Sequence, residues 1–304
     1  MPDLRLTASF VPGELTQPLL DGVVAPAGVE LSLTAGKSVD ANSRQMLDGA
    51  FDVAEMSFAT FLKAHEQGRD LIGLPMFTGR GFLQPGVVCR EAAGIDKPED
   101  LRGKRVGLPQ FWQTSSVWHR GILEQQHGVR QQDVTWCTAA EERFEGLRLP
   151  EGVRLERLDE GHSVGDALAA AEVDAIMTPP RGAPKTVGGG IKRAYADVAS
   201  AEQHYFAATG VFPIMHFVVM RQTLAGQHAW LPEALFAAFK QAKQQVKLQP
   251  PVEGMDPGRA WAYGLAPNRG TLETFLDFCS GLGWLARRPR LEDLFAASTL
   301  ALDG

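Results

Sequence analysis

Hydroxyl, aromatic and cationic side chains gather between Arg105 and Leu123 at a spacing that could bind an aromatic acid. Residues 105–108 are mostly aliphatic and predict a buried strand, and hydroxyl side chains that can cap a helix follow at Thr114, Ser115 and Ser116. A helix N-terminus after the carboxyl end of a strand presents unpaired N–H groups to an anion. The rings of Phe111 and Trp112 and the guanidinium of Arg120 would lie beside it. An ordinary strand–turn–helix unit with a hydroxyl cap explains the pattern equally well.

Short apolar runs alternate with helical patterns along the rest of the chain. Strands are predicted at residues 4–9, 29–33, 51–56, 71–77, 87–89, 105–108, 134–137, 153–158, 174–177 and 214–220. Helices are predicted at residues 43–47, 58–65, 117–123, 164–172, 231–248 and 271–285. This alternation predicts an α/β fold with mainly parallel sheets flanked by helices.

Composition and charge restrict the class of protein and of ligand. The chain has 304 residues, enough for two domains, and a net charge of −6 without a basic run, which argues against a nucleic-acid partner. An anionic ligand would need a local group of cationic side chains. The cysteines (Cys89, Cys137 and Cys279) lie far apart and in no metal-binding spacing, so we expect reduced thiols.

The N-terminal segment lacks the features of a secretory signal peptide. No apolar run approaches the ~18 residues that a membrane span requires. We therefore expect a cytoplasmic protein without a membrane partner, and the sequence leaves a homo-oligomer open.

Five stretches of the chain resemble the 4,5-dihydroxyphthalate decarboxylase family, and together they run nearly end to end. They are residues 51–61, 94–129, 209–221, 261–273 and 292–300. Within them, Pro98-Glu-Asp-Leu-Arg-Gly-Lys104 is common in type II periplasmic binding proteins and indicates only that fold. Phe212-Pro-Ile-Met-His216 and Trp261-Ala-Tyr-Gly-Leu265 are much more specific.

Two segments depart from the pattern of the family. Gln110-Phe111 stands where an acidic residue followed by Tyr is expected, and residues 79–85 are less basic than expected. Both would lie near the ligand, so the exact ring substituents are left open.

The resemblance implies a two-lobe, periplasmic-binding-protein-like type II fold with a ligand cleft between the lobes. Lobe one would comprise residues 1–84 plus 216–304, and lobe two residues 85–215. Side chains at strand C-termini and helix N-termini would face the cleft.

The resemblance also implies the activity of a carboxy-lyase of aromatic catabolism. The reaction converts 4,5-dihydroxyphthalate into protocatechuate and CO₂. Because direct loss of CO₂ would leave carbanion character on the ring, the expected route first protonates the ring carbon that carries the carboxylate. Such a site needs a proton donor, cations or N–H groups for the retained carboxylate, and an acceptor for the phenol. No organic cofactor is needed.

Two residues are candidates for the proton donor, His216 and Glu55. A histidine that titrates near neutrality suits general acid catalysis. Glu55 stands at a strand end among apolar residues, where burial would raise its pKa and keep it protonated. The alternative is a hinge histidine bonded to backbone and an ion-paired acid that holds a wall of the cleft.

Substrate binding is assigned to cationic, hydroxyl and aromatic side chains that the resemblance places near the cleft. Guanidinium groups suit a carboxylate because they bind it in two-point geometry. The candidates are Arg80, Arg120, Arg181, Ser57, Thr114, Ser115, Thr178, Phe10 and Trp112. Structural roles are the alternative for each arginine, and the hydrophobic core for either ring.

No metal site is predicted, because the seven histidines include neither an HExxH motif nor a His-x-His pair. A divalent metal held by His216, Glu55 and the catechol oxygens of the substrate is left open. Two other classes of protein are also considered. One is a solute-binding protein for an aromatic or other organic anion. The other is a different cytoplasmic enzyme on the same fold, related to the menaquinone-pathway dehydratase or the thiamin-pyrimidine synthase.

Overall fold

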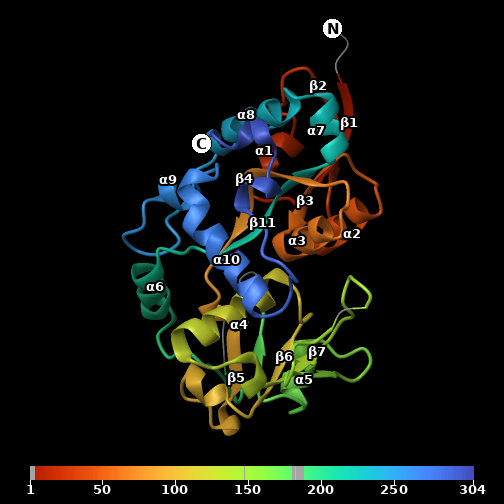
Figure 1. Cartoon of the computed structure of the whole chain (residues 1–304). Coiled ribbons are helices and arrows are strands. Elements are labelled where there is room, and N and C mark those ends of the chain that lie inside the picture. The colour runs from red at the N-terminus through yellow and green to blue at the C-terminus, as the bar shows by residue number, and fades with distance from the viewer. Residues whose placement is uncertain (1–3, 147, 180–181, 183–187) are drawn as a thin grey trace. The chain divides into compact units, whose positions relative to one another are not determined.

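The computed structural model describes residues 4–146, 148–179, 182 and 188–304. Their contacts divide the chain into two compact units (Figure 1). The first unit comprises the chain up to Arg80, Ile214–Leu276 and Arg287–Gly304, and the second comprises Gly81–Pro213 and Asp277–Ala286. Each unit has its own β-sheet flanked by helices, so the predicted α/β architecture is confirmed.

The first unit is built on a five-stranded sheet in the order β2-β1-β3-β11-β4. Its strands are β1 (Leu4–Phe10), β2 (Val29–Ala35), β3 (Val53–Ser57), β4 (Ile72–Arg80) and β11 (Ile214–Met220). The predicted mixed, mainly parallel arrangement is confirmed, because β1 is parallel to β2 and β3 and only β11 runs antiparallel to its neighbours.

Helices of the first unit cover both faces of this sheet, which explains the near-continuous apolar character of its strands. They are α1 (Gln17–Leu20), α2 (Val39–Leu47), α3 (Phe58–Glu66), α7 (Gln222–Gln227), α8 (Leu231–Gln244), α9 (Pro257–Ala260) and the first part of α10 (Arg269–Gly281). Successive residues of β11 serve opposite faces. Phe217 packs against Phe58 and Phe61 of α3, whereas Val218 belongs to the core cluster that contains Phe239 of α8.

The second unit is built on a six-stranded sheet in the order β10-β5-β9-β6-β7-β8. The strands are β5 (Val87–Arg90), β6 (Arg105–Leu108), β7 (Thr135–Thr138), β8 (Arg154–Arg157), β9 (Ala175–Met177) and β10 (Ile191–Arg193). Here β5 runs antiparallel to its neighbours and the other strands share one direction. The flanking helices are α4 (Thr114–His127), α5 (Val164–Ala169) and α6 (Val198–Thr209).

The predicted division of the chain differs from the observed one by a few residues at the crossings, 81–84 and 214–215, and chiefly in residues 277–286. The latter residues pack in the second unit, where Trp284 stacks on Trp112 with ring centroids 4.9 Å apart. Phe278 lies over Gly121 of α4, where an added Cβ would come within 2.1 Å of its ring. Glycine therefore permits this close approach of helix and ring. The cleft itself stays a prediction.

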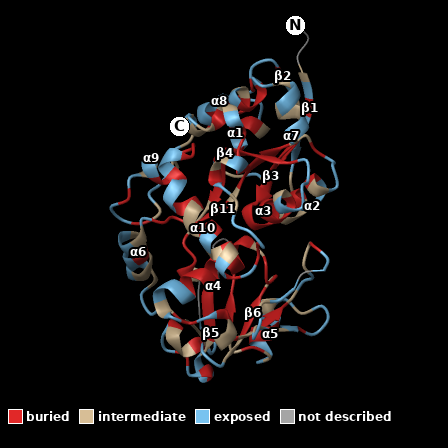
Figure 2. Cartoon of the chain, in the orientation of Figure 1, coloured by how far each residue is buried: buried red, intermediate tan, exposed pale blue. Residues whose placement is uncertain are grey.

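All ten predicted strands are present, whereas β10, α6 and the short helices α1, α7 and α9 were missed. The pattern of α6 was too weak to predict, since Tyr205 is its one fully buried residue and its apolar residues form no clear stripe. Among the residues that the structure describes, no helix combines the length and the apolar character needed to cross a membrane. Figure 2 shows how buried residues concentrate in the two sheets.

Candidate functional site

Glu55 of β3 is a buried acid held by groups from two neighbouring segments of the first unit. Its side chain is 5% exposed. One carboxylate oxygen accepts a hydrogen bond from the backbone N–H of Val11 at 3.0 Å, just after β1. The other accepts from the hydroxyl of Thr78, on β4, at 2.7 Å. The carboxyl ends of parallel strands thus converge on this acid.

His216 of β11 lies next to Glu55, with its Nδ1 atom 3.8 Å from the nearer carboxylate oxygen. The imidazole side chain is 32% exposed, so the buried acid supports a partly accessible histidine. The pairing of β11 with β4 shifts register on either side of His216, and such irregularities re-aim side chains. Gly79 makes room, because an added Cβ would come within 2.4 Å of Nδ1. The two predicted proton donors are therefore brought together, and their catalytic role stays a prediction.

Arg80 ends β4 two residues after Thr78. One of its terminal nitrogens donates to the carbonyl oxygen of Ala262 at 3.1 Å and to the amide oxygen of Asn268. Asn268 in turn donates to the carbonyl oxygens of Ala262 and Gly264, at 2.9 and 2.7 Å. Burial lowers the pKa of the Arg80 guanidinium, and Tyr263 opposes that shift. The side chain of Arg80 is therefore held by Ala262 of the Trp261–Leu265 motif and by Asn268, which is itself bonded to this motif.

Gly264 allows that motif to bend. Its φ of +93° lies in the region that favours glycine, and an added Cβ would come within 2.3 Å of the carbonyl oxygen of Leu302. Tyr263 beside it is fully buried, and its hydroxyl has no hydrogen-bond partner among the described residues.

Phe10 and Ser57, two further predicted binding residues of the first unit, contact other residues of that unit. Phe10 is fully buried, with its ring edge-on to Phe239 at 5.2 Å, so a stacking role toward a ligand is not supported. Ser57 precedes α3, and its backbone N–H donates to the hydroxyl of Ser43 at 3.1 Å. No contact described for Ser57 tests the predicted substrate-binding role.

Arg120 and Trp112 of the second unit form part of a packed cluster. Arg120 is fully buried and donates to the carbonyl oxygens of Phe111 and Ser116 and to the amide oxygen of Gln131, at 2.7, 3.1 and 3.0 Å. The guanidinium carbon lies 3.6 Å from the ring centroid of Phe111. These are the contacts of a structural arginine and do not support a ligand-binding role. Trp112, 3% exposed against Trp284, is likewise a core residue.

The start of α4 differs from the sequence prediction. Gln113 is the N-cap residue, without a side-chain cap, and Thr114 is already the first helical residue. The hydroxyls of Ser115 and Ser116 are buried and have no partner among the described residues. They lie within the first turn, so the hydroxyl caps predicted at these positions were wrong. Whether Thr114 or Ser115 contacts a substrate stays a prediction.

Glu142 is a residue that sequence reasoning missed. Its carboxylate accepts hydrogen bonds from the backbone N–H groups of Phe111, at 2.6 Å, and Trp112, at 3.3 Å. Gln110, one of the departures noted above, holds the neighbouring Glu141 carbonyl. Burial raises the pKa of Glu142, and the two backbone hydrogen bonds oppose the shift. These two N–H groups, which precede α4, are thus bonded to a carboxylate of the protein itself, and anion binding by the first turn of α4 stays a prediction.

Thr178 follows β9, and its carbonyl oxygen lies 3.0 Å from Nε2 of the buried His119. Burial lowers the pKa of His119 to about 4, and the hydrogen bond to Thr178 opposes that shift. The hydroxyl of Thr178 lies 3.5 Å from the carbonyl oxygen of Gly86. Arg181, the last predicted binding residue, lies outside the described residues.

One group of described residues could supply metal ligands, Asp159, His162 and Glu172 in the second unit. His162 Nδ1 is 2.6 Å from a carboxylate oxygen of Glu172, which an ordinary hydrogen bond explains. Neither Glu55 nor His216 belongs to this group.

The chain is similar in sequence to proteins of known families. Residues 24–145 match the family described as NMT1/THI5 like. A curated 4,5-dihydroxyphthalate decarboxylase of Comamonas testosteroni is 30% identical over 99% of this chain and 98% of its own length. Another, of Pseudomonas putida, is 31% identical over 58% of this chain and 71% of its own length.

The fold is matched among solved structures as well. A Candida albicans protein, described as defining a new family with the generic periplasmic binding protein structural fold, covers 100% of this chain and 99% of its own, with a TM-score of 0.55. At 12% identity this likeness speaks for the fold alone. The predicted periplasmic-binding-protein-like fold is thereby confirmed.

Proposed function

Because the chain belongs to the 4,5-dihydroxyphthalate decarboxylase family, we propose that it removes one ring carboxylate from 4,5-dihydroxyphthalate. The products would be protocatechuate and CO₂, which makes the protein a carboxy-lyase of phthalate degradation. The near-full-length identity to a curated decarboxylase supports this activity over that of a solute-binding protein.

The chemistry requires a proton at the ring carbon that carries the departing carboxylate. That carbon accepts the proton, and the hydroxyl para to it supports the positive charge that develops on the ring. The bond to the carboxylate then breaks, its electron pair restores the aromatic ring, and CO₂ leaves. The proton donor regains its proton from solvent, so each turnover consumes one proton.

The observation that carries the proposal is the pair of Glu55 and His216, 3.8 Å apart at the strand ends of the first unit. A partly exposed imidazole can reach a substrate, whereas Glu55 is engaged by donors from Val11 and Thr78. We therefore assign His216 as the general acid. Glu55 orients the ring and stabilises its protonated form, as a carboxylate partner does for a catalytic histidine.

Arg80 is the proposed binding group for the carboxylate that stays on the ring. It ends the strand that carries Thr78, and Ala262 and Asn268 fix its orientation. A guanidinium held in this way can bind a carboxylate through two parallel hydrogen bonds. A shortened or neutral side chain at this position should raise KM more than it lowers kcat.

The test is an assay of CO₂ release by the purified chain with 4,5-dihydroxyphthalate, 4-hydroxyphthalate and phthalate. We expect turnover of the dihydroxylated acid and little or none of phthalate, which lacks a hydroxyl para to either carboxylate. Assays with and without a chelator decide whether a divalent metal takes part. Tight binding of one of these acids without any CO₂ would overturn the proposal and leave a solute-binding protein.

We also propose that the protein works in the cytoplasm. The three cysteines are free and buried, which suits a reducing compartment. Fractionation of the source cells tests the location, and light scattering of the purified chain tests whether it forms a homo-oligomer.

A further inference from the structure

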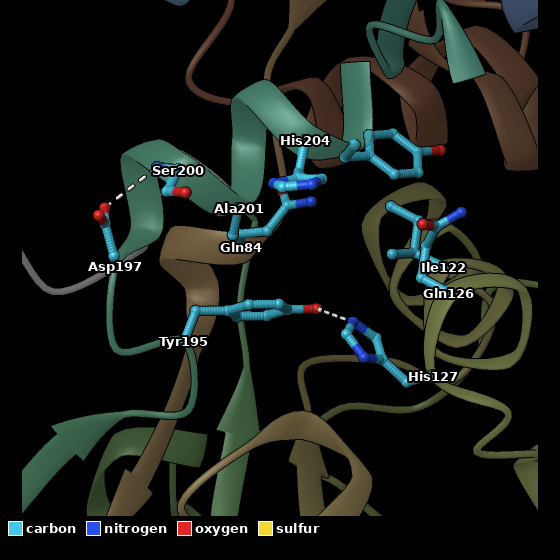
Figure 3. A pocket seen from close by; sticks show the side chains of 10 residues that line it. Gln84, Ile122, Gln126, His127, Tyr195, Asp197, Ser200, Ala201 and His204 are labelled. Carbon is cyan, nitrogen blue, oxygen red and sulfur yellow. Dashed lines mark hydrogen bonds between the residues drawn. The ribbon is translucent and has the colours of Figure 1, made fainter. Parts of the chain in front are cut away.

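A pocket apart from the candidate site around Glu55 and His216 lies wholly within the second unit (Figure 3). It has a volume of about 350 Å³, within the range of small-molecule sites. Helices α4 and α6, the 3₁₀ turn Gln84–Gly86 and the segment between β10 and α6 form its walls. None of its lining residues takes part in the proposed reaction, so a role for this pocket is independent of that proposal.

A chain of hydrogen bonds ends at the pocket. Nδ1 of His127 lies 2.9 Å from a carboxylate oxygen of Glu99, and its Nε2 lies 3.1 Å from the hydroxyl of Tyr195. Burial by itself would raise the pKa of the Glu99 carboxyl. The hydrogen bonds to this carboxyl, above all that from His127, hold its pKa below the usual value. The Glu99 carboxylate accepts the Nδ1 proton, and the Tyr195 oxygen keeps a lone pair whether its hydroxyl donates to Nε2 or accepts from it. The Tyr195 oxygen therefore faces the pocket as an acceptor.

The opposite side of the pocket offers a donor. The amide oxygen of Gln84 accepts the backbone N–H of Leu83 at 3.0 Å, which directs its NH₂ group to other acceptors. Figure 3 shows Gln84 and His204 across the pocket from the ring of Tyr195. One wall thus accepts a hydrogen bond and the other donates one.

The remaining lining combines apolar and polar side chains, and it carries no guanidinium or ammonium group. Ile122 and Ala201 line it beside the ring of Tyr195, and its lining residues include neither Lys nor Arg. The carboxylate of Asp197, also in the lining, already accepts the backbone N–H of Ser200 at 3.0 Å. A dicarboxylate would find no Lys or Arg here, and both ring nitrogens of His127 are already bonded, whereas a neutral ring with hydroxyl groups satisfies both walls.

We propose that this pocket binds a small uncharged aromatic molecule with two hydroxyl groups, a catechol. One hydroxyl donates to the oxygen of Tyr195, another accepts from the NH₂ group of Gln84, and the ring lies against the Tyr195 face. The site selects against the charged acids that the first unit is proposed to bind.

Calorimetric titration of the full chain with catechol, under anaerobic conditions, tests the proposal. We expect one site, unchanged by saturating phthalate and at least about tenfold weaker for benzoate, because a carboxylate gains no cation in this pocket. Displacement of catechol by phthalate, or equal affinity for benzoate, would overturn the proposal.

Two variants locate the site. Tyr195→Phe keeps the ring but removes the acceptor, and it should weaken catechol about tenfold. Ala201→Leu fills the pocket and should abolish binding, whereas Ala199→Leu, at an exposed position of α6 outside the pocket lining, should leave it unchanged. Catechol affinity that is the same in Ala201→Leu and the unaltered chain would exclude this pocket as its site.

Discussion

The strand ends of the two units illustrate two uses of the same local pattern. In the first unit, the groups around Glu55 leave the neighbouring His216 partly exposed. In the second, the groups before α4 are bonded to one another, with Glu142 on the N–H groups of Phe111 and Trp112. Arg120 is equally committed, to three oxygens of its own unit. The polar groups of a strand–turn–helix segment are therefore open to a ligand only where the protein itself does not occupy them.

The largest expected effect concerns the accessible histidine. His216→Ala should lower kcat by about 10²–10⁴-fold, because it removes the general acid. Steady-state CO₂ release measures the effect, and titration with substrate shows whether binding persists. His228→Ala, a change of another partly exposed histidine in the first unit, is the control and should retain activity. A near-normal kcat of the His216→Ala protein would show that His216 is not the general acid.

Arg120→Met should lower the free energy of unfolding by roughly 3 kcal/mol, because it leaves buried oxygens of Phe111, Ser116 and Gln131 without their donor. Urea unfolding measures this change. Arg130→Met is the matched control, since that side chain is 64% exposed and should change stability far less. A stable Arg120→Met protein that has lost substrate affinity would instead make Arg120 a ligand-binding cation.

The buried His119 predicts a dependence of stability on pH. Its pKa is lowered from 6.5 to about 4 by burial, so the unfolded chain binds this proton more readily than the folded one. Stability from this group is therefore present above pH 6.5 and is lost as pH falls toward 4, by up to about 3 kcal/mol. His119→Gln keeps a donor for Thr178 and should flatten the profile of unfolding free energy between these pH values. An unchanged slope would assign the loss to other groups.

Thr78→Val should have the smallest effect of the four. The change preserves the shape of the side chain but removes a donor to Glu55, so kcat should fall about tenfold and the free energy of unfolding by about 1 kcal/mol. Thr34→Val, at an exposed position of β2, provides the comparison and should change neither quantity. Unaltered turnover by Thr78→Val would show that the hydroxyl does not help to orient the catalytic pair.

Much of the fold could be predicted because its strands are short apolar runs that can be recognised in the sequence alone. The apolar run Ile214–Met220 predicts a strand wherever it packs, since both of its faces meet helices. The ends were less certain, and α6 was missed because it lies half-exposed without an apolar stripe. Residues 277–286 pack in the second unit, which the sequence did not predict, since a helix pattern does not reveal which partner its rings contact.

Local sequence also identified Glu55 and His216 as chemically capable residues, and tertiary structure decided that they are neighbours. They are 161 positions apart in the chain, and the antiparallel pairing of β11 with β3 and β4 brings them together. The same kind of long-range contact put Glu142 onto the backbone of Phe111, 31 positions away. Residue types and periodicity determined the elements and the available chemistry, because these depend on near neighbours. Which polar groups are left accessible depends on distant segments, and only packing could decide it.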